Sequence, residues 1–274
     1  TPDKVGEYSV YATYKILKSD TKKMTVTSSS SSETKDFKQN VLIEDVTGAW
    51  CQHCPRVSYR LEQLKKQTSQ LVVVAAHYGD ALQYSKVSEL SNLFGLKGYP
   101  WAQLNRTQRW NEQSGSVTAL VDNKAKAGVA LESTLSEKTL TLKFKSKFAE
   151  DFSDLKYVVF LLEDDIKLDQ SQWAGGDYGY GRGTDRDGDG RMWLINFNHT
   201  DVLRHAFTSG PLGDAIPLSS TKKGTTFEKS FTYEVPTSFN KEKLKLVGIV
   251  VKKDNKVINV RLSEIGKTQA FEEL

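Results

Sequence analysis

Cys51 and Cys54 are the only two cysteines in this chain of 274 residues. A disulfide that closes so short a loop removes little entropy from the unfolded chain, so it adds little stability. The same spacing suits thiol–disulfide exchange, in which a thiolate attacks a disulfide sulfur. We therefore expect the pair to perform redox chemistry.

The position of the pair predicts separate roles for its two thiols. Apolar residues recur every three or four positions from Val57 onward, which predicts a helix whose first turn contains both cysteines. The free N–H groups and the dipole at a helix start favour a thiolate. Cys51, nearer the helix start and shielded by Trp50, is expected to attack, and Cys54 to resolve the mixed disulfide.

Three neighbouring features fit this chemistry. His53, beside the resolving cysteine, stabilises a thiolate when protonated and makes the disulfide more oxidising. Asp45 lies six residues before Cys51 near the end of a predicted strand, where a buried carboxylate can relay a proton. Pro100 falls between a predicted helix and a predicted strand, where a cis proline fits.

Two alternatives compete with a redox role for the cysteines. They can form half of a zinc site, but zinc needs about four ligands, and the chain has four histidines and no further cysteine. They can also be an inert dithiol on a binding protein. His77 is a candidate for a direct part in the redox chemistry, while a place at the edge of the core is the alternative.

A glycine- and aspartate-rich connection at 169–191 carries a second candidate site. Asp185, Asp187 and Asp189, followed by Gly190, match the first half of a calcium loop, because alternate carboxylates can converge on one cation. Position twelve of that pattern is Asn196, a poor substitute for a bidentate glutamate. The sequence therefore offers either a calcium site or a solvated acidic turn.

The elements that must position these residues fall into three segments. Residues 1–40 are expected to form an N-terminal arm with a short hairpin and a serine-rich linker. Residues 41–130 alternate strand and helix patterns, which predicts an α/β domain with parallel strands. Residues 131–274 carry about seven short strand patterns, which predict an antiparallel β-sandwich. The alternative is that these strands extend the sheet of the first domain.

The middle segment resembles the thioredoxin family. The resemblance rests on residues 41–51 (VLIEDVTGAWC) and on Gly98-Tyr99-Pro100. It implies a thioredoxin-like domain with Cys51 as nucleophile, Cys54 as resolving thiol and Asp45 as buried acid, and with Tyr99 and Pro100 in the substrate groove. Gln52-His53 departs from thioredoxin itself and is more similar to protein disulfide isomerases.

The chain as a whole resembles the 28-kilodalton outer-membrane protein family. The resemblance rests on TGAWC joined to Cys54-Pro55, on His77, and on Asn198-His199 followed by Val202-Leu203-Arg204. It implies a lipid-anchored protein of a Gram-negative bacterium, outside the cytoplasm and associated with the outer membrane, with a β-sandwich behind the redox domain. Members of this family are also discussed as adhesins.

We therefore predict an extracytoplasmic thiol–disulfide oxidoreductase or isomerase that acts on protein or peptide substrates. It requires no cofactor, although calcium binding is possible. The alternative is a cell-surface binding protein or adhesin in which the sandwich and its 169–191 loop, with Trp173, Tyr178 and Tyr180, bind the ligand. The 38 basic and 34 acidic residues are interleaved, which argues against nucleic acid. No apolar run approaches the length of a membrane span, so membrane attachment is expected through a lipid on an N-terminus that precedes Thr1.

Overall fold

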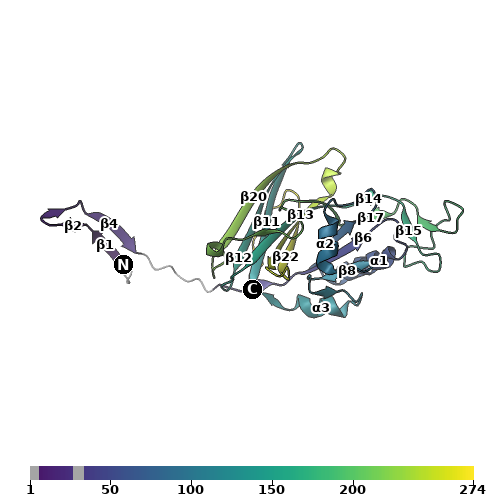
Figure 1. Ribbon diagram of the computed structural model, residues 1–274, viewed down its shortest axis with the longest axis horizontal. Coiled ribbons are helices and arrows are strands. Elements are labelled where there is room, and N and C mark those ends of the chain that lie inside the picture. Colours follow the sequence, from purple (N-terminus) through teal and green to yellow (C-terminus); the bar gives the residue numbers. More distant parts are fainter. Residues whose placement is uncertain (1–5, 27–33) are drawn as a thin grey trace. The chain divides into compact units, whose positions relative to one another are not determined.

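The computed structural model of the chain describes residues 6–26 and 34–274, which belong to two separate compact units. In the first unit, β1 (Gly6–Val10) pairs antiparallel with β4 (Lys22–Val26), and β2 (Thr13–Tyr14) pairs with β3 (Leu17–Lys18) (Figure 1). These paired strands form the hairpin that was expected in the N-terminal arm. The predicted serine-rich linker lies mainly at 28–32, outside the described residues.

The second unit is built around one large mixed sheet. In sheet order its strands within the described residues are β22 (Val257–Glu264), β21 (Leu244–Lys252), β13 (Leu155–Glu163), β18 (Val202–Ala206), β7 (Leu71–His77), β6 (Val41–Thr47), β8 (Trp101–Leu104) and β9 (Gln108–Arg109), with β19 (Asp214–Ala215) beside β13. The β7 strand pairs in parallel with both β6 and β18, and the other pairings are antiparallel.

This sheet shows that the predicted fold class, a thioredoxin-like domain followed by a separate antiparallel sandwich, is wrong. The β6 and β7 strands come from the expected first domain, and β18, β13, β21 and β22 come from the expected second. The two sets join where the Ala75 N–H donates to the Asp201 carbonyl (2.8 Å). Residue 131 also lies inside a strand, β11 (Ala127–Ser136). Strand patterns in the sequence predict strands but not their partners, and here the later strands extend the first sheet.

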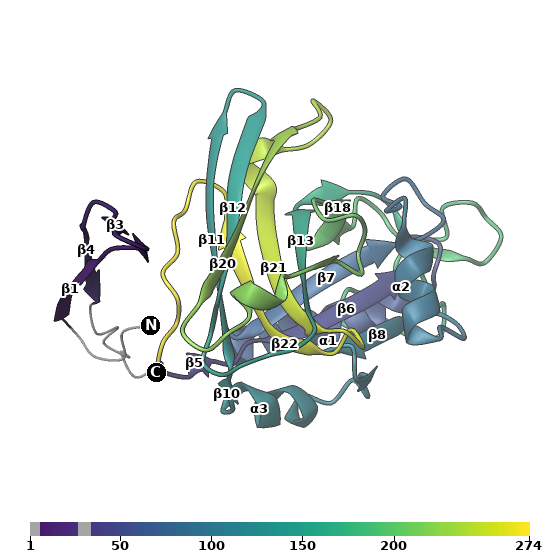
Figure 2. The ribbon, with the colours of Figure 1, turned by 60° about the vertical axis from the view of Figure 1, so that its left-hand side comes forward.

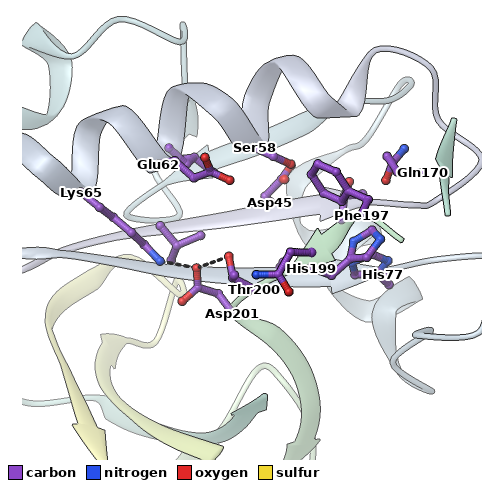
Figure 3. A pocket seen from close by; sticks show the side chains of 15 residues that line it. Asp45, Ser58, Glu62, Lys65, His77, Gln170, Phe197, His199, Thr200 and Asp201 are labelled. Carbon is purple, nitrogen blue, oxygen red and sulfur yellow. Dashed lines mark hydrogen bonds and ion pairs between the residues drawn. The ribbon is translucent and has the colours of Figure 1, made fainter. Parts of the chain in front are cut away.

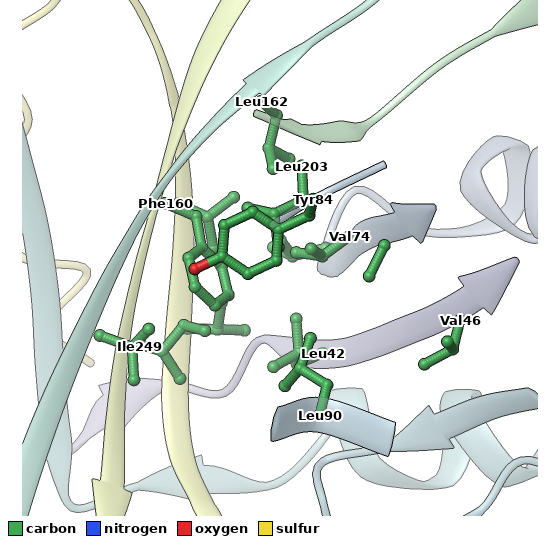
Figure 4. Close-up of a cluster of buried hydrophobic side chains, with 14 of the residues drawn as sticks. Leu42, Val46, Val74, Tyr84, Leu90, Phe160, Leu162, Leu203 and Ile249 are labelled. Carbon is green, nitrogen blue, oxygen red and sulfur yellow. The ribbon is translucent and has the colours of Figure 1, made fainter. Parts of the chain in front are cut away.

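Helices cover both faces of the β6–β7 part of the sheet. Alternate residues of a strand point to opposite faces, and Ile43 packs with α1 (Cys54–Gln67) and α3 (Gly115–Val121). Leu42 packs on the other face with α2 (Val87–Phe94). Figure 4 shows that second core, where Leu42 and Leu90 lie near Phe160 of the β13 strand.

The β13 and β21 strands divide their side chains between two cores. Phe160 faces the α2 side, while Val159 and Leu161 face a smaller antiparallel sheet of β11, β12 (Thr139–Phe148) and β20 (Thr226–Glu234). Figure 2 shows these three strands side by side, to the left of β21 and β13 of the main sheet. Both cores contain side chains of β13, so this one strand packs against early and late segments of the unit.

Short paired segments complete the second unit. They are β5 (Phe37–Lys38) with β10 (Lys124–Ala125), β14 (Ile166–Lys167) with β17 (Asn198–His199), and β15 (Gln170–Gln172) with β16 (Met192–Leu194), together with the 3-10 turns Leu218–Ser220 and Lys241–Lys243. The β15–β16 pair brings the two ends of the long glycine-rich connection together. No helix in the described residues is both long and apolar enough to cross a membrane.

Candidate functional site: the Cys51–Cys54 disulfide

The two cysteines form a disulfide at the start of α1, with their Cα atoms 5.4 Å apart. The chain turns sharply after β6, where the Cys51 N–H donates to the Gly48 carbonyl (2.9 Å). Cys51 is 5% exposed and Cys54 is 1% exposed. The pair is therefore an almost completely buried disulfide at a helix N-terminus, with Cys51 the slightly more exposed of the two.

The electrostatic surroundings of the pair favour a sulfur anion. The first turn of α1, which is fully described, holds no acidic residue, and Pro55 occupies an early helical position where its missing N–H costs nothing. The remaining free N–H groups of that turn give the helix start partial positive charge. A thiolate formed on reduction is stabilised there.

An aromatic cluster lies on one side of the disulfide. The Trp50 indole N–H donates to the Tyr78 carbonyl (2.8 Å), and its ring meets the edge of Tyr99 at 5.0 Å between ring centroids. Tyr99 also stacks on Tyr78, and the Tyr99–Pro100 peptide bond is cis. The structure thus brings the predicted residues Trp50, Tyr99 and Pro100 together beside loop 48–54, which carries the disulfide.

A second segment, which the sequence did not connect with the disulfide, forms hydrogen bonds to the residues around Cys51. The Ser171 N–H donates to the Ala49 carbonyl (2.7 Å), and the Trp173 N–H donates to the Gln52 carbonyl (2.9 Å). The Gln170 amide lies 3.0 Å from the Cys51 carbonyl. The start of the 169–191 loop is therefore part of the site around the disulfide, and its only signal in the sequence was a cluster of aromatic residues among glycines.

His53 contacts the same loop. Its Nδ1 lies 2.6 Å from the Tyr178 hydroxyl, and its ring is 5.7 Å from the Trp173 ring. Trp173 and Tyr178 in turn stack on each other. The histidine between the cysteines is thus held by two aromatic residues from the loop.

Asp45 lies in a small cavity beneath α1, of about 40 Å³. That is room for a few water molecules. Burial, and then the negative charge of Glu112, raise the pKa of Asp45 to about 8. Its Oδ1 has no hydrogen-bond partner among the described residues. Figure 3 shows Asp45 facing Ser58, whose hydroxyl donates to the Cys54 carbonyl (3.4 Å). The cavity therefore reaches Ser58, one helical turn along α1 from Cys54.

The two buried histidines of this region meet at the far wall of the same cavity. The His77 and His199 rings lie edge to face, 5.0 Å apart. Burial, and then the neighbouring His77, lower the pKa of His199 to about 4, so His199 is neutral at pH 7. The His77 Nδ1 is 2.7 Å from Asp80, which also accepts from the Ala49 N–H (2.6 Å). The His77 side chain is thus linked through Asp80 to the Ala49 N–H of loop 48–54.

The structure does not bring the predicted calcium ligands together. Asp187 pairs with Arg186 (2.8 Å), Asp189 pairs with Arg191 (2.7 Å), and Asp185 accepts from the Gly190 N–H. In residues 6–26 and 34–274 no group of three acidic, histidine or cysteine side chains is placed to hold a metal ion. Calcium binding stays a prediction from the sequence.

These features define a class of protein: a mixed-sheet fold with a single disulfide at a helix start, whose neighbouring residues form hydrogen bonds to a distant loop. The chain belongs to a family described as outer membrane protein Omp28, whose model matches residues 87–269, more than half of the chain. The predicted location, outside the cytoplasm and associated with the outer membrane, is confirmed by this membership. The matched residues begin after the disulfide, so the family match does not speak to its chemistry.

Two solved structures from Porphyromonas gingivalis are similar to this chain. HBP35 matches with a TM-score of 0.64 at 20% identity, over 85% of this chain and 77% of that chain, which shows a shared fold. A domain of the outer membrane lipoprotein Omp28 matches with a TM-score of 0.33 at 18% identity, over 53% of this chain and 100% of that domain. No curated protein matches the sequence.

Proposed function

We propose that this outer-membrane-associated protein is a thiol–disulfide oxidoreductase that acts on cysteines of protein or peptide substrates. The observation that carries the proposal is the Cys51–Cys54 disulfide at the N-terminus of α1. A bridge over so few residues contributes little to stability, and a helix start favours the thiolate that exchange requires. Both properties suit a reactive pair better than a structural one.

Oxidation of a substrate proceeds in two thiol–disulfide exchanges. A substrate thiolate attacks one sulfur of the Cys51–Cys54 disulfide, so a mixed disulfide to Cys51 forms and Cys54 leaves as a thiolate. A second substrate thiolate then attacks the substrate sulfur of the mixed disulfide and releases Cys51. The substrate gains a disulfide, the protein gains two thiols, and two electrons have moved to the protein. Reduction of a substrate is the same sequence in reverse.

Asp45 is suited to exchange protons with the site. A carboxyl whose pKa is near 8 holds its proton at neutral pH and can release or regain it close to that pH. The cavity that contains Asp45 also touches Ser58, which lies one helical turn after Cys54 and bonds to its carbonyl. We assign Asp45 the role of proton donor and acceptor, through water, for the resolving thiol.

The substrate is expected to approach over the exposed aromatic residues beside the Cys51 loop. Trp50 and Tyr78 are 43% and 44% exposed there. An open groove of about 470 Å³ begins at Trp50 and is lined farther on by Trp193 and Arg186. Exposed aromatic faces and a groove of this size suit an extended peptide chain.

Matched serine variants of the two cysteines test this proposal. With its remaining thiol reduced, Cys54→Ser should attack a peptide disulfide through Cys51, form a stable mixed disulfide and release the other peptide thiol, while Cys51→Ser should form much less. The wild-type chain should catalyse insulin reduction or oxidation of a reduced peptide, and both variants should lose that activity. Equal activity of the wild-type chain and both variants would contradict the proposal that the protein is a thiol–disulfide oxidoreductase.

A further inference from the structure

Segment 170–180 is joined by main-chain hydrogen bonds to residues 48–54, which we call the redox loop after the proposed function. About 120 residues separate the two segments in the sequence. Ser171 donates to the Ala49 carbonyl and Trp173 donates to the Gln52 carbonyl. The segment therefore forms a fixed wall of the site, and its side chains have defined places relative to the two sulfurs.

Gln170 holds the carbonyl groups that surround Cys51. Its buried side-chain amide lies 3.3 Å from the Gly48 carbonyl, 3.2 Å from the Ala49 carbonyl and 3.0 Å from the Cys51 carbonyl. Carbonyl oxygens carry partial negative charge, which opposes a thiolate nearby. An amide donor that binds these oxygens reduces that opposition and fixes the turn.

Tyr178 holds the ring of His53. Its hydroxyl lies within hydrogen-bonding distance of Nδ1 (2.6 Å), and the tautomer of the ring sets which of the two groups donates. The next residue is Gly179, where an added Cβ would lie 2.3 Å from the Tyr59 ring of α1. The Tyr180 hydroxyl then donates to Glu62 of the same helix (2.6 Å). The position of Tyr178 is thus fixed by contacts with α1 on its C-terminal side.

We propose that Gln170 and Tyr178 are positioning residues that set the redox equilibrium and the thiolate reactivity of the Cys51–Cys54 pair. Tyr178 acts through His53, and Gln170 acts through the carbonyls of the redox loop. The inference rests on the proposed function for its biological meaning. Its tests use no protein substrate, so they give an answer even where the oxidoreductase assay fails.

A double-mutant cycle tests the role of Tyr178. The equilibrium constant of the full-length chain with reduced and oxidised glutathione is measured for Tyr178→Phe, His53→Ala and the double variant. Tyr178→Phe should shift that constant at least about threefold, and the shift should vanish in the His53→Ala background, because residues that act together are not additive. Tyr180→Phe is the matched control, since it removes a bonded hydroxyl in the same segment without removing the bond to His53, and it should shift the constant less than Tyr178→Phe does.

Three results would overturn the role of Tyr178. They are an unchanged constant in Tyr178→Phe, the same shift with and without His53, and an equal shift in Tyr180→Phe. The last two would show that the segment only supports the fold.

Gln170 has its own matched control in Gln172, two residues along β15. The Gln172 amide donates to the Gly176 carbonyl (3.3 Å) and to the Gly181 carbonyl, both within its own loop. Gln170→Leu should slow alkylation of reduced Cys51 by iodoacetamide at pH 7 at least about threefold. Without the amide donor, the carbonyl oxygens around Cys51 are left unbound and their partial negative charge destabilises the Cys51 thiolate. Gln172→Leu should not. Equal rates in the two variants would contradict the role of Gln170.

Discussion

At the scale of single residues, Asp45 shows how burial changes the chemistry of one carboxyl. It is 2% exposed, and its pKa of about 8 lies far above the ordinary value. In the unfolded chain the pKa returns to near 4, so the folded state holds the proton more tightly. The stability that this proton contributes is therefore complete below about pH 4 and is lost as the pH rises to about 8.

Asp45→Asn should remove that loss of stability. We expect the variant to gain roughly 1–4 kcal/mol of unfolding free energy relative to wild type between pH 5 and pH 8. Urea denaturation at the two pH values measures this difference. The exposed carboxyl of Asp154 provides the control, because Asp154→Asn should show no comparable pH dependence. A gain that is the same at both pH values would contradict the raised pKa.

Gly48 leaves the space that the Trp50 ring needs to reach the Tyr78 carbonyl. An added Cβ would lie 2.7 Å from the indole nitrogen of Trp50 and 2.8 Å from the Tyr78 carbonyl, which are the two partners of the Trp50 hydrogen bond. Gly48→Ala should therefore displace the indole, cost about 1–3 kcal/mol of stability, and shift Trp50 fluorescence. Gly98→Ala, where no atom lies within 4 Å of the added Cβ, should cost much less. Equal costs would refute the steric argument.

The sequence predicted well what depends on neighbours along the chain. Cys51, Cys54 and Trp50 lie next to one another because a strand, a tight turn and a helix follow in order, and each has a local pattern. Gln170 and Tyr178 were not predicted as part of the redox site, because only the folded chain brings them to it. Local patterns contain no information about such distant contacts.

At the scale of elements, a buried ion pair ties β6 to the turn after β8 and to the second half of the chain. Arg106 donates to both oxygens of Glu44 (2.7 and 2.6 Å) and to the Pro211 carbonyl (2.9 Å). Both charged side chains are fully buried. Such a pair is costly to break from one side, because a charge is then left unpaired in the core.

Arg106→Met should destabilise the protein by about 3–5 kcal/mol, and Glu44→Leu together with Arg106→Met should restore much of that loss. Urea denaturation measures both. Lys222→Met, which breaks the exposed pair with Asp151, serves as the control and should cost less than about 1 kcal/mol. A double variant as unstable as the single one would show that the pair matters through its shape and not through its charge.

At the scale of the whole molecule, the main sheet explains why local patterns predicted the wrong fold class. The strand patterns of 41–46 and 71–78 correspond to β6 and β7, and the helix pattern after Val57 corresponds to α1. Their order suggested a complete α/β domain that ends near residue 130. The structure instead places β18 against β7, so the apolar face of the expected first domain is covered by strands of the second.

The pairing of β7 with β18 leads to a prediction about fragments of the chain. Leu42 and Val74 pack against Phe160 and Leu203, so a fragment of residues 34–130 would expose this face to water. We expect that fragment to be unfolded or aggregated, whereas residues 34–274 should melt in one transition at the temperature of the full chain, because they form one compact unit. Circular dichroism with limited proteolysis checks both. A cooperative melt of 34–130 alone would show that the β6–β7 half folds independently, and that the joint with β18 forms only after each half has its own core.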